Sequence, residues 1–338
     1  LYDALGYGAS GLSLYLDPGA DPLGFLLGLL ERGPILLFHQ WSQVNIDPWV
    51  ALPRSGQLAM AAAGWLTVAG LAALFLPLLR RDRDARFWAL GMVLSTLPAC
   101  GAFPMARLTL FTGIGAVALL AALARDQGHL SPDEAPLPRG WRPRATRVLL
   151  WAHGPVAAGL LLFGAFIFPS VTAFIPRAAR AAAPDTPEVA NQHLVLINGY
   201  DMYTMYIPAM RQVLGVPRPR TTSQLASISS DLIVSREAPD SLTITARAGF
   251  LANSTDHLMW QKGHAFVPGQ QRQRPAFTAT VDRVTDDGRP LTVTFQFTTP
   301  LEHPSLILRA VVDGRLVPFT PPPVGGEVTL PWTLPALR

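Results

Sequence analysis

The chain has 338 residues, of which 49% are hydrophobic and only 15% are charged, and its formal net charge is +4. An ordinary soluble domain carries about 25% charged residues, so this composition indicates a membrane protein. The positive charge comes almost wholly from dispersed arginines, because Lys262 is the only lysine. Without a basic stripe interleaved with aromatic residues, the sequence argues against nucleic-acid binding.

Residues 1–57 form the first predicted segment. The chain begins at Leu1 without a signal-peptide pattern, so we expect a fragment of a longer protein with further membrane segments upstream. Its apolar runs at 23–30 and 34–38 are too short to cross a bilayer. Trp41 and Trp49 favour the membrane interface, which predicts one or two helices lying on the outer surface. A loop packed on helices of the missing part is the alternative.

Residues 58–170 are predicted to contain a bundle of transmembrane helices. A bilayer core of about 30 Å requires roughly 20 apolar residues in a helix. The chain offers four such stretches: 58–79, 87–106, 108–124 and 148–169. Pro77, Pro98 and Pro155 lie inside three of them and predict kinks, because neighbouring helices satisfy the freed carbonyls.

The loops between these stretches predict their orientation. The sequence RRDRDAR at 80–86 carries four arginines, and the loop 125–147 carries five more, whereas the turn at 101–106 is short and has only Arg107 beside it. Short arginine-rich loops stay in the cytoplasm. The sequence therefore predicts a multi-pass protein of the bacterial inner membrane whose N-terminal segment and C-terminal domain face the periplasm.

The rest of the chain reads as a connector and an extracytoplasmic domain. Residues 171–192 are rich in Ala and Pro and predict a connector, and residues 193–338 predict a mainly antiparallel β domain. That domain begins with a short strand at 194–197, a turn at Asn198-Gly199 and a helix. We expect residues from about 190 onward to fold alone.

Two-residue alternation dominates from about residue 230. The stretch SLTITAR places Leu242, Ile244 and Ala246 on one face of a strand, and Asp313-Gly314 is a strong hairpin signal. Six or seven such strands indicate an antiparallel sandwich or an open barrel.

Two residues near the predicted spans are candidate binding residues. His153 lies within a span, where a histidine ligates haem or chlorophyll or relays protons. The span offers no second histidine and no acid, so contact with lipid headgroups is the favoured alternative and no cofactor is predicted. Arg107 follows a proline at the outer boundary, where it holds a lipid phosphate or another anion, or simply extends to the interface.

Two further groups lie in the predicted outer domain. Met202, Met205 and Tyr206 recur at helical spacing and are candidates for contact with a partner protein. In the sequence STDHLMWQKGHAF, three side chains are candidate metal ligands: Asp256, His257 and His264. Their spacing matches no common zinc pattern, so solvated loop residues are the favoured interpretation and no metal is predicted.

Some tracts resemble known proteins. GYGASGLSLYLDP and VDGRLVPFTPP are similar to tracts in multi-span inner-membrane proteins of GC-rich bacteria to which we attach no activity. The layout of spans followed by an outer β domain also resembles the C-terminal half of GT-C glycosyltransferases, which use lipid-linked sugars. That likeness is one of architecture, because no residue here matches the catalytic acids that the family carries near its N-terminus.

The expected function follows from these observations. The sequence contains no Gly-x-Ser-x-Gly, His-Glu-x-x-His or P-loop motif. We therefore expect a non-catalytic membrane subunit or scaffold of an envelope complex, in contact with membrane lipids and with other membrane or periplasmic subunits. The alternative is the C-terminal half of a GT-C-like transferase.

Overall fold

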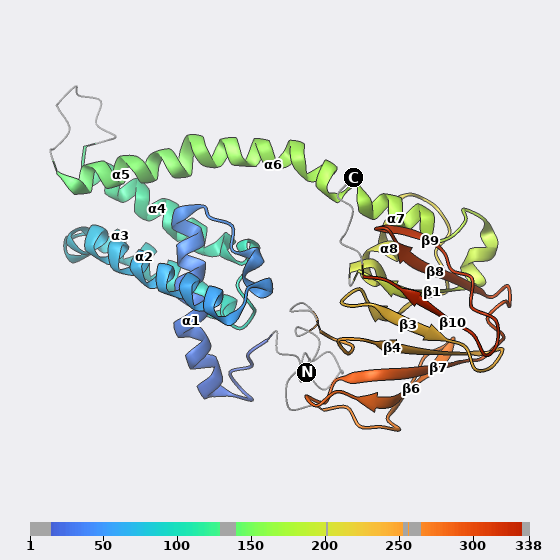
Figure 1. The fold of residues 1–338 in the computed structure, drawn as a ribbon. Coiled ribbons are helices and arrows are strands. Elements are labelled where there is room, and N and C mark those ends of the chain that lie inside the picture. Colours follow the sequence, from blue (N-terminus) through green and yellow to red (C-terminus); the bar gives the residue numbers. More distant parts are fainter. Residues whose placement is uncertain (1–14, 129–139, 201, 253–255, 257–264, 333–338) are drawn as a thin grey trace. The chain divides into compact units, whose positions relative to one another are not determined.

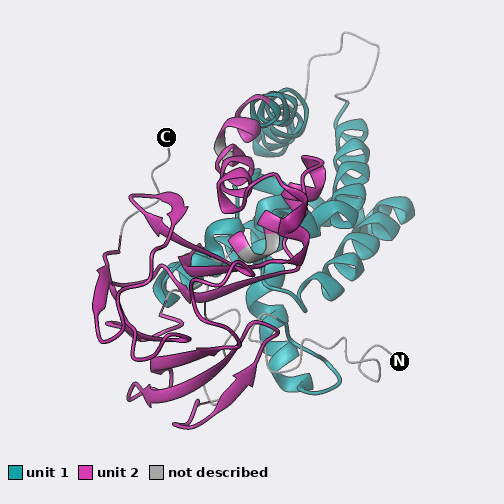
Figure 2. Cartoon of the chain, turned by 90° about the vertical axis from the view of Figure 1, so that its right-hand side faces the viewer, with its two compact units in different colours: residues 1–165 teal, residues 166–338 magenta. Residues whose placement is uncertain are grey.

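The computed structural model describes residues 15–128, 140–200, 202–252, 256 and 265–332. The chain divides into two compact units, residues 1–165 and 166–338 (Figure 2). The first unit is helical, and the second contains all the strands that the structure describes.

The helical unit contains three helices that are long and apolar enough to cross a membrane: Arg54–Arg81, Ala106–Asp126 and Trp141–Ala182, the last of which continues into the second unit. The elements in chain order are α1 Pro22–Ser42, η2 Asp47–Ala51, α2 Arg54–Arg81, α3 Arg83–Ala99, η3 Ala106–Thr109, α4 Leu110–Asp126, α5 Trp141–Trp151, η4 Ala152–Val156 and α6 Ala157–Thr172. The coarse prediction of a bundle of apolar helices is thus confirmed, whereas the predicted second span differs.

That second span was expected at 87–106, but α3 has only 17 residues and ends at Ala99. It starts early because the Asp82 carboxylate accepts hydrogen bonds from the backbone N–H groups of Asp84 and Ala85, which caps the helix. It ends early because Pro98 lies in its last turn, so the proline marks the end of the helix and not a kink. Pro77, in contrast, lies inside α2, which continues to Arg81.

The helix α1 differs from the predicted interfacial helices. It joins both apolar runs in one 21-residue helix, in which Ile35 and Leu36 are fully buried. The Trp65 indole on α2 donates to the Leu30 carbonyl over 3.0 Å. Buried Arg32 donates to the Cys100 carbonyl over 3.1 Å. The second half of α1 therefore packs inside the helical unit, whereas its first half leaves Leu23, Leu26, Leu27 and Leu30 exposed.

The last membrane-length helix is much longer than the predicted span 148–169. It runs over 42 residues from Trp141 to Ala182 and includes one π-helical turn, η4, where Pro155 removes a backbone donor. Its final part, α7 Phe174–Ala182, falls in the stretch that was predicted as a connector. Four alanines in α7 favour a helix, so the prolines of this stretch do not make all of it an irregular connector.

The second unit contains two sheets with strand orders β2-β1-β8-β9 and β10-β3-β4-β7-β6-β5. The other elements are α7, η5 Pro187–Asn191 and α8 Met202–Val213. The strands are β1 His193–Gly199, β2 Thr221–Ser227, β3 Leu232–Ser235, β4 Ser241–Ala246, β5 Gln271–Gln273, β6 Phe277–Val284, β7 Pro290–Phe297, β8 Leu306–Val312, β9 Arg315–Pro318 and β10 Glu327–Leu330.

The six-stranded sheet is antiparallel as predicted, but the four-stranded sheet is mixed. In that sheet β1 pairs in parallel with both β2 and β8. The reason is α8: a helix between two strands returns the chain to the same end of the sheet and so produces a parallel pair. The predicted strand and helix at the start of the domain are present, but their consequence for strand pairing was missed.

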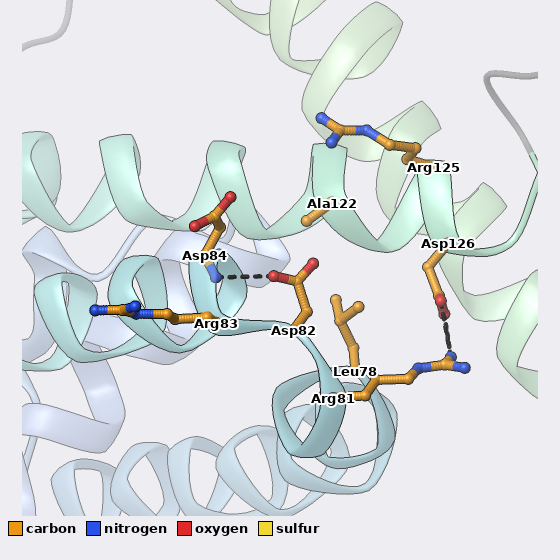
Figure 3. Close-up of a pocket in the computed structure, with 8 residues that line it drawn as sticks. All are labelled: Leu78, Arg81, Asp82, Arg83, Asp84, Ala122, Arg125 and Asp126. Carbon is orange, nitrogen blue, oxygen red and sulfur yellow. Dashed lines mark hydrogen bonds and ion pairs between the residues drawn. The ribbon is translucent and has the colours of Figure 1, made fainter.

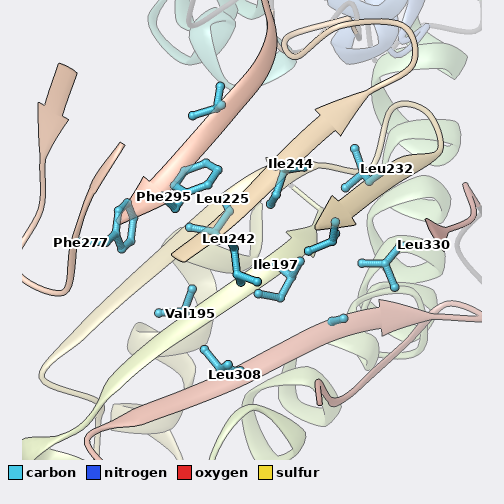
Figure 4. Packing of buried hydrophobic residues seen from close by; sticks show 14 of the residues in the cluster. Val195, Ile197, Leu225, Leu232, Leu242, Ile244, Phe277, Phe295, Leu308 and Leu330 are labelled. Carbon is cyan, nitrogen blue, oxygen red and sulfur yellow. The ribbon is translucent and has the colours of Figure 1, made fainter. Parts of the chain in front are cut away.

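The main core lies between the two sheets (Figure 4). Leu242, Ile244 and Ala246 of β4 are all buried, as the alternation predicted. Their partners come from the facing sheet and include Val195, Ile197 and Leu308.

Two predicted turns have different outcomes. Asp313-Gly314 does join β8 to β9, and both residues have positive φ, as a two-residue hairpin turn requires. Asn198-Gly199 is not a turn, because both residues continue β1. The buried Asn198 amide donates to the Val311 carbonyl and accepts from the Val311 N–H, which fixes it within the sheet.

A helical layer covers the four-stranded sheet. Figure 1 shows α7 and α8 beside β1, β8 and β9. A second apolar cluster joins Ala178 and Ala182 of α7, Tyr203 and Ile207 of α8, and Leu196 of β1. The second unit therefore consists of a helical layer and two packed sheets.

Candidate functional site

Arg107 lines an apolar cleft in the helical unit. The cleft has a volume of about 840 Å³ and is lined mainly by η3 and α4, together with Gln40 from the end of α1. Leu110, Ile114 and Val117 form its apolar wall, and Arg107 is its only charged lining residue. The structure thus places Arg107 beside an apolar surface, and its predicted contact with a lipid or an anion stays a prediction.

Gln40 also places the end of α1 inside the bundle. Its side-chain oxygen lies 3.3 Å from where a Cβ would stand on Gly113. Gly113 comes seven residues after Ala106, the start of its membrane-length helix, so this level is roughly 10 Å along that helix at 1.5 Å per residue. Polar groups this far along a membrane-length helix cost free energy to bury, and they often mark functional regions.

His153 contacts the same turn of α1. Its Nε2 lies 2.9 Å from the Gln40 carbonyl oxygen and its Nδ1 lies 3.0 Å from the Leu149 carbonyl oxygen. The ring also packs against Trp41, with centroids 5.5 Å apart. Both ring nitrogens therefore face carbonyl oxygens, and a haem or metal bond would require the ring to turn away from these contacts. His153 thus contacts Gln40, which lines the same cleft as Arg107, and the sequence did not predict this arrangement.

A second cavity lies where α2 ends, α3 begins and α4 ends (Figure 3). Its volume is about 470 Å³, and it is lined by Leu78, Arg81, Asp82, Arg83, Asp84, Ala122, Arg125 and Asp126. Arg81 and Asp126 form an ion pair of 2.7 Å across it. The sequence analysis used the RRDRDAR stretch only to orient the helices, and its proximity to Arg125 and Asp126 of α4 became visible only in the fold.

The predicted partner-contact residues lie on α8. Tyr206 is 45% exposed, and Ala209 and Val213 are exposed on the same side of the helix. The side chains of Met202 and Met205 lie outside what the structure describes. The opposite side of α8 packs inward, where burial and neighbouring Tyr200 raise the pKa of Tyr203 to about 12.

Of the three predicted metal ligands, the structure describes only Asp256. Asp256 is buried and accepts a hydrogen bond from the Ser227 hydroxyl over 3.2 Å. His257 and His264 lie outside the described residues. Within the described ranges, no group of three or more His, Cys, Asp or Glu side chains is arranged to hold a metal ion.

Two buried arginines of the second unit were missed by the sequence analysis. Arg211 is fully buried and donates five hydrogen bonds. Arg236 is 6% exposed and forms an ion pair with Glu302 at 2.6 Å. This bond lowers the pKa of Glu302 below its usual value. Both arginines hold loops and helix ends, and nothing in their local sequence distinguishes them from surface arginines.

Comparison of the chain with protein-family models, with curated proteins and with solved structures gives no match.

Proposed function

We propose that the chain is a non-catalytic integral membrane subunit whose outer domain binds another envelope protein. The observation that carries the proposal is the two-sided character of α8. Tyr203, Ile207 and Arg211 fix its inner side within the domain. Tyr206 and Val213, which is 77% exposed, leave an apolar stripe on its outer side. Aromatic side chains on a rigid helix are typical anchors of protein interfaces.

The proposed topology places this domain in the periplasm of a bacterial inner-membrane protein. The arginine-rich α2–α3 turn and the loop after α4 supply the positive charge that favours the cytoplasmic side. With α3 counted as a short fourth span, both the N-terminal segment and the outer domain come to the opposite side. The proposed partners are membrane lipids and other membrane or periplasmic subunits.

Photo-crosslinking in intact cells tests the partner proposal. A photoreactive amino acid at position 206 or 213 is expected to give the same discrete adduct, because both positions lie on one side of α8. The same group at Val324, which is 54% exposed in a loop of the same unit, is the matched control. Adducts that are equal at all three positions, or that are missing at 206 and 213, would show that α8 does not bind a partner.

A second candidate function is the C-terminal half of a GT-C-like transferase. The apolar cleft that Arg107 lines favours it, because an enzyme that uses lipid-linked sugars needs to hold a phosphate at the end of an apolar chain. An acidic pair in the first outer loop of the full-length protein would support this reading, and upstream outer loops without Asp or Glu would exclude it.

A further inference from the structure

The cavity in Figure 3 combines equal numbers of positive and negative side chains at one end of the helical unit. Three arginines and three aspartates line it, so its formal charge is zero. Two of its acids already have structural roles. Asp82 caps α3, and Asp126 pairs with Arg81.

The other charges are available to a ligand. Among the described residues, the side chains of Arg83, Asp84 and Arg125 form no ion pair and no hydrogen bond, and only the backbone N–H of Asp84 is bonded to the Asp82 carboxylate. In Figure 3 the Arg125 guanidinium extends past Ala122 toward the side on which Asp84 lies, away from the Arg81–Asp126 pair. The cavity therefore offers at least one free cation and one free anion.

The surroundings of the cavity are those of a membrane boundary. Leu78 and Ala122 form its apolar part. Phe87, one turn into α3, is 66% exposed, and Leu76, in the last two turns of α2, is 45% exposed. Exposed apolar side chains this close to a charged cavity place it where lipid chains meet headgroups.

We propose that this cavity binds the headgroup of a zwitterionic aminophospholipid, phosphatidylethanolamine. The phosphate lies against Arg125, because a guanidinium group binds phosphate oxygens with paired hydrogen bonds. The primary ammonium donates to Asp84. A purely anionic lipid fits less well, since its headgroup would leave Asp84 next to uncompensated negative charge. This proposal goes beyond the partner-binding function and does not depend on it.

Native mass spectrometry of the purified full chain tests the proposal with three lipids that have identical acyl chains. Phosphatidylethanolamine is expected to be retained roughly tenfold better than phosphatidylcholine, the difference made by one charge-assisted hydrogen bond. Phosphatidylcholine is the matched probe, because methylation removes the N–H donors and keeps the charge. Equal retention of these two lipids, or stronger retention of phosphatidylglycerol by the unmodified chain, would overturn the proposal.

Variants identify the site. Asp84→Asn is expected to remove the preference for phosphatidylethanolamine over phosphatidylcholine and to increase phosphatidylglycerol adducts, while the Asp82 cap stays in place. Arg125→Gln is expected to weaken both phosphatidylethanolamine and phosphatidylglycerol. Arg86→Gln, in the same turn but outside the cavity, is the control and leaves retention unchanged. Equal effects of Arg125→Gln and Arg86→Gln would refute the assignment, as would complete displacement of the lipid by soluble O-phosphoethanolamine.

Discussion

The second unit is expected to need α7 for its stability, and substitution of Arg211 tests this expectation. Its guanidinium joins α8 to the end of α7 through hydrogen bonds to the Pro217, Ala179, Ala183 and Pro184 carbonyls and to the Asp185 carboxylate. Four of these five acceptors precede residue 190. A fragment of residues 190–338, the unit that the sequence suggested, would therefore lose most of the partners of a fully buried cation.

The expected loss of stability on Arg211→Met follows from the carbonyl groups that lose their donor. In a fragment of residues 174–338, Arg211→Met leaves four carbonyl oxygens without their donor, and those of Ala179 and Ala183 are buried. Because each unsatisfied buried group costs about 1–3 kcal/mol, we expect the free energy of unfolding to fall by at least about 2 kcal/mol. In the fragment 190–338 the same substitution removes only the bond to Pro217, so we expect a loss of about 1 kcal/mol.

Urea denaturation followed by circular dichroism measures both differences. The longer fragment is expected to unfold cooperatively and at higher urea than the shorter one. Arg315→Met is the matched control, because Arg315 is exposed on β9, and it should change stability by less than about 0.5 kcal/mol in either fragment. Equal effects of Arg211→Met in the two fragments would refute the reasoning, and so would equal stability of the unsubstituted fragments.

Three further predictions concern pH, packing and topology. The bond from Arg236 lowers the pKa of Glu302, so its stabilisation is present above the unfolded pKa of about 4.3 and is lost as pH falls through the folded value. Glu302→Gln should flatten the acid loss of stability, measured by urea midpoints between about pH 6 and 3, and unchanged slopes would contradict this. A Cβ on Gly64 would lie 2.6 Å from the Pro34 backbone, whereas one on Gly70 would meet nothing within 4 Å. Gly64→Val should therefore lower the melting temperature in detergent and Gly70→Val should not; equal melting temperatures would place α1 elsewhere. Finally, an impermeant thiol reagent should not label Arg83→Cys in intact cells, against a background free of Cys100, which is buried; labelling at position 83 would reverse the orientation.

The sequence predicted the helical unit well where apolar length decides the structure. Runs without charge at 58–79 and 108–124 became α2 and α4, because such segments have no other way to satisfy their backbone in an apolar phase. The predicted end of α3 was wrong, because the helix ends just after Pro98, whereas hydrophobicity alone would extend it to 106. A hydropathy average takes no account of the position of a proline within a helix.

In the second unit, the alternation of apolar residues predicted which face of each strand is buried, but it did not predict which strands pair. The buried positions of β4 and β7 follow directly from a period of two residues. The parallel neighbours of β1 depend on α8 and on β8, which comes more than 100 residues later in the chain. No local pattern contains that information. The same limit hid Arg211, whose acceptors lie up to 32 residues away.

The placement of α1 shows why the candidate sites needed the fold. The apolar runs at 23–30 and 34–38 are each too short to cross a bilayer, and the charges of Glu31 and Arg32 between them have partners in the bundle. Glu31 pairs with Arg54 at 2.6 Å, and Arg32 donates to carbonyls that the early end of α3 leaves free. Because α1 is thus held inside the bundle, its last turn brings Gln40 to both His153 and the Arg107 cleft. Contacts between distant residues offset the cost of burying polar groups. When each segment is analysed alone, α1 is therefore predicted to lie on the surface, and residues that share a site are not recognised as neighbours.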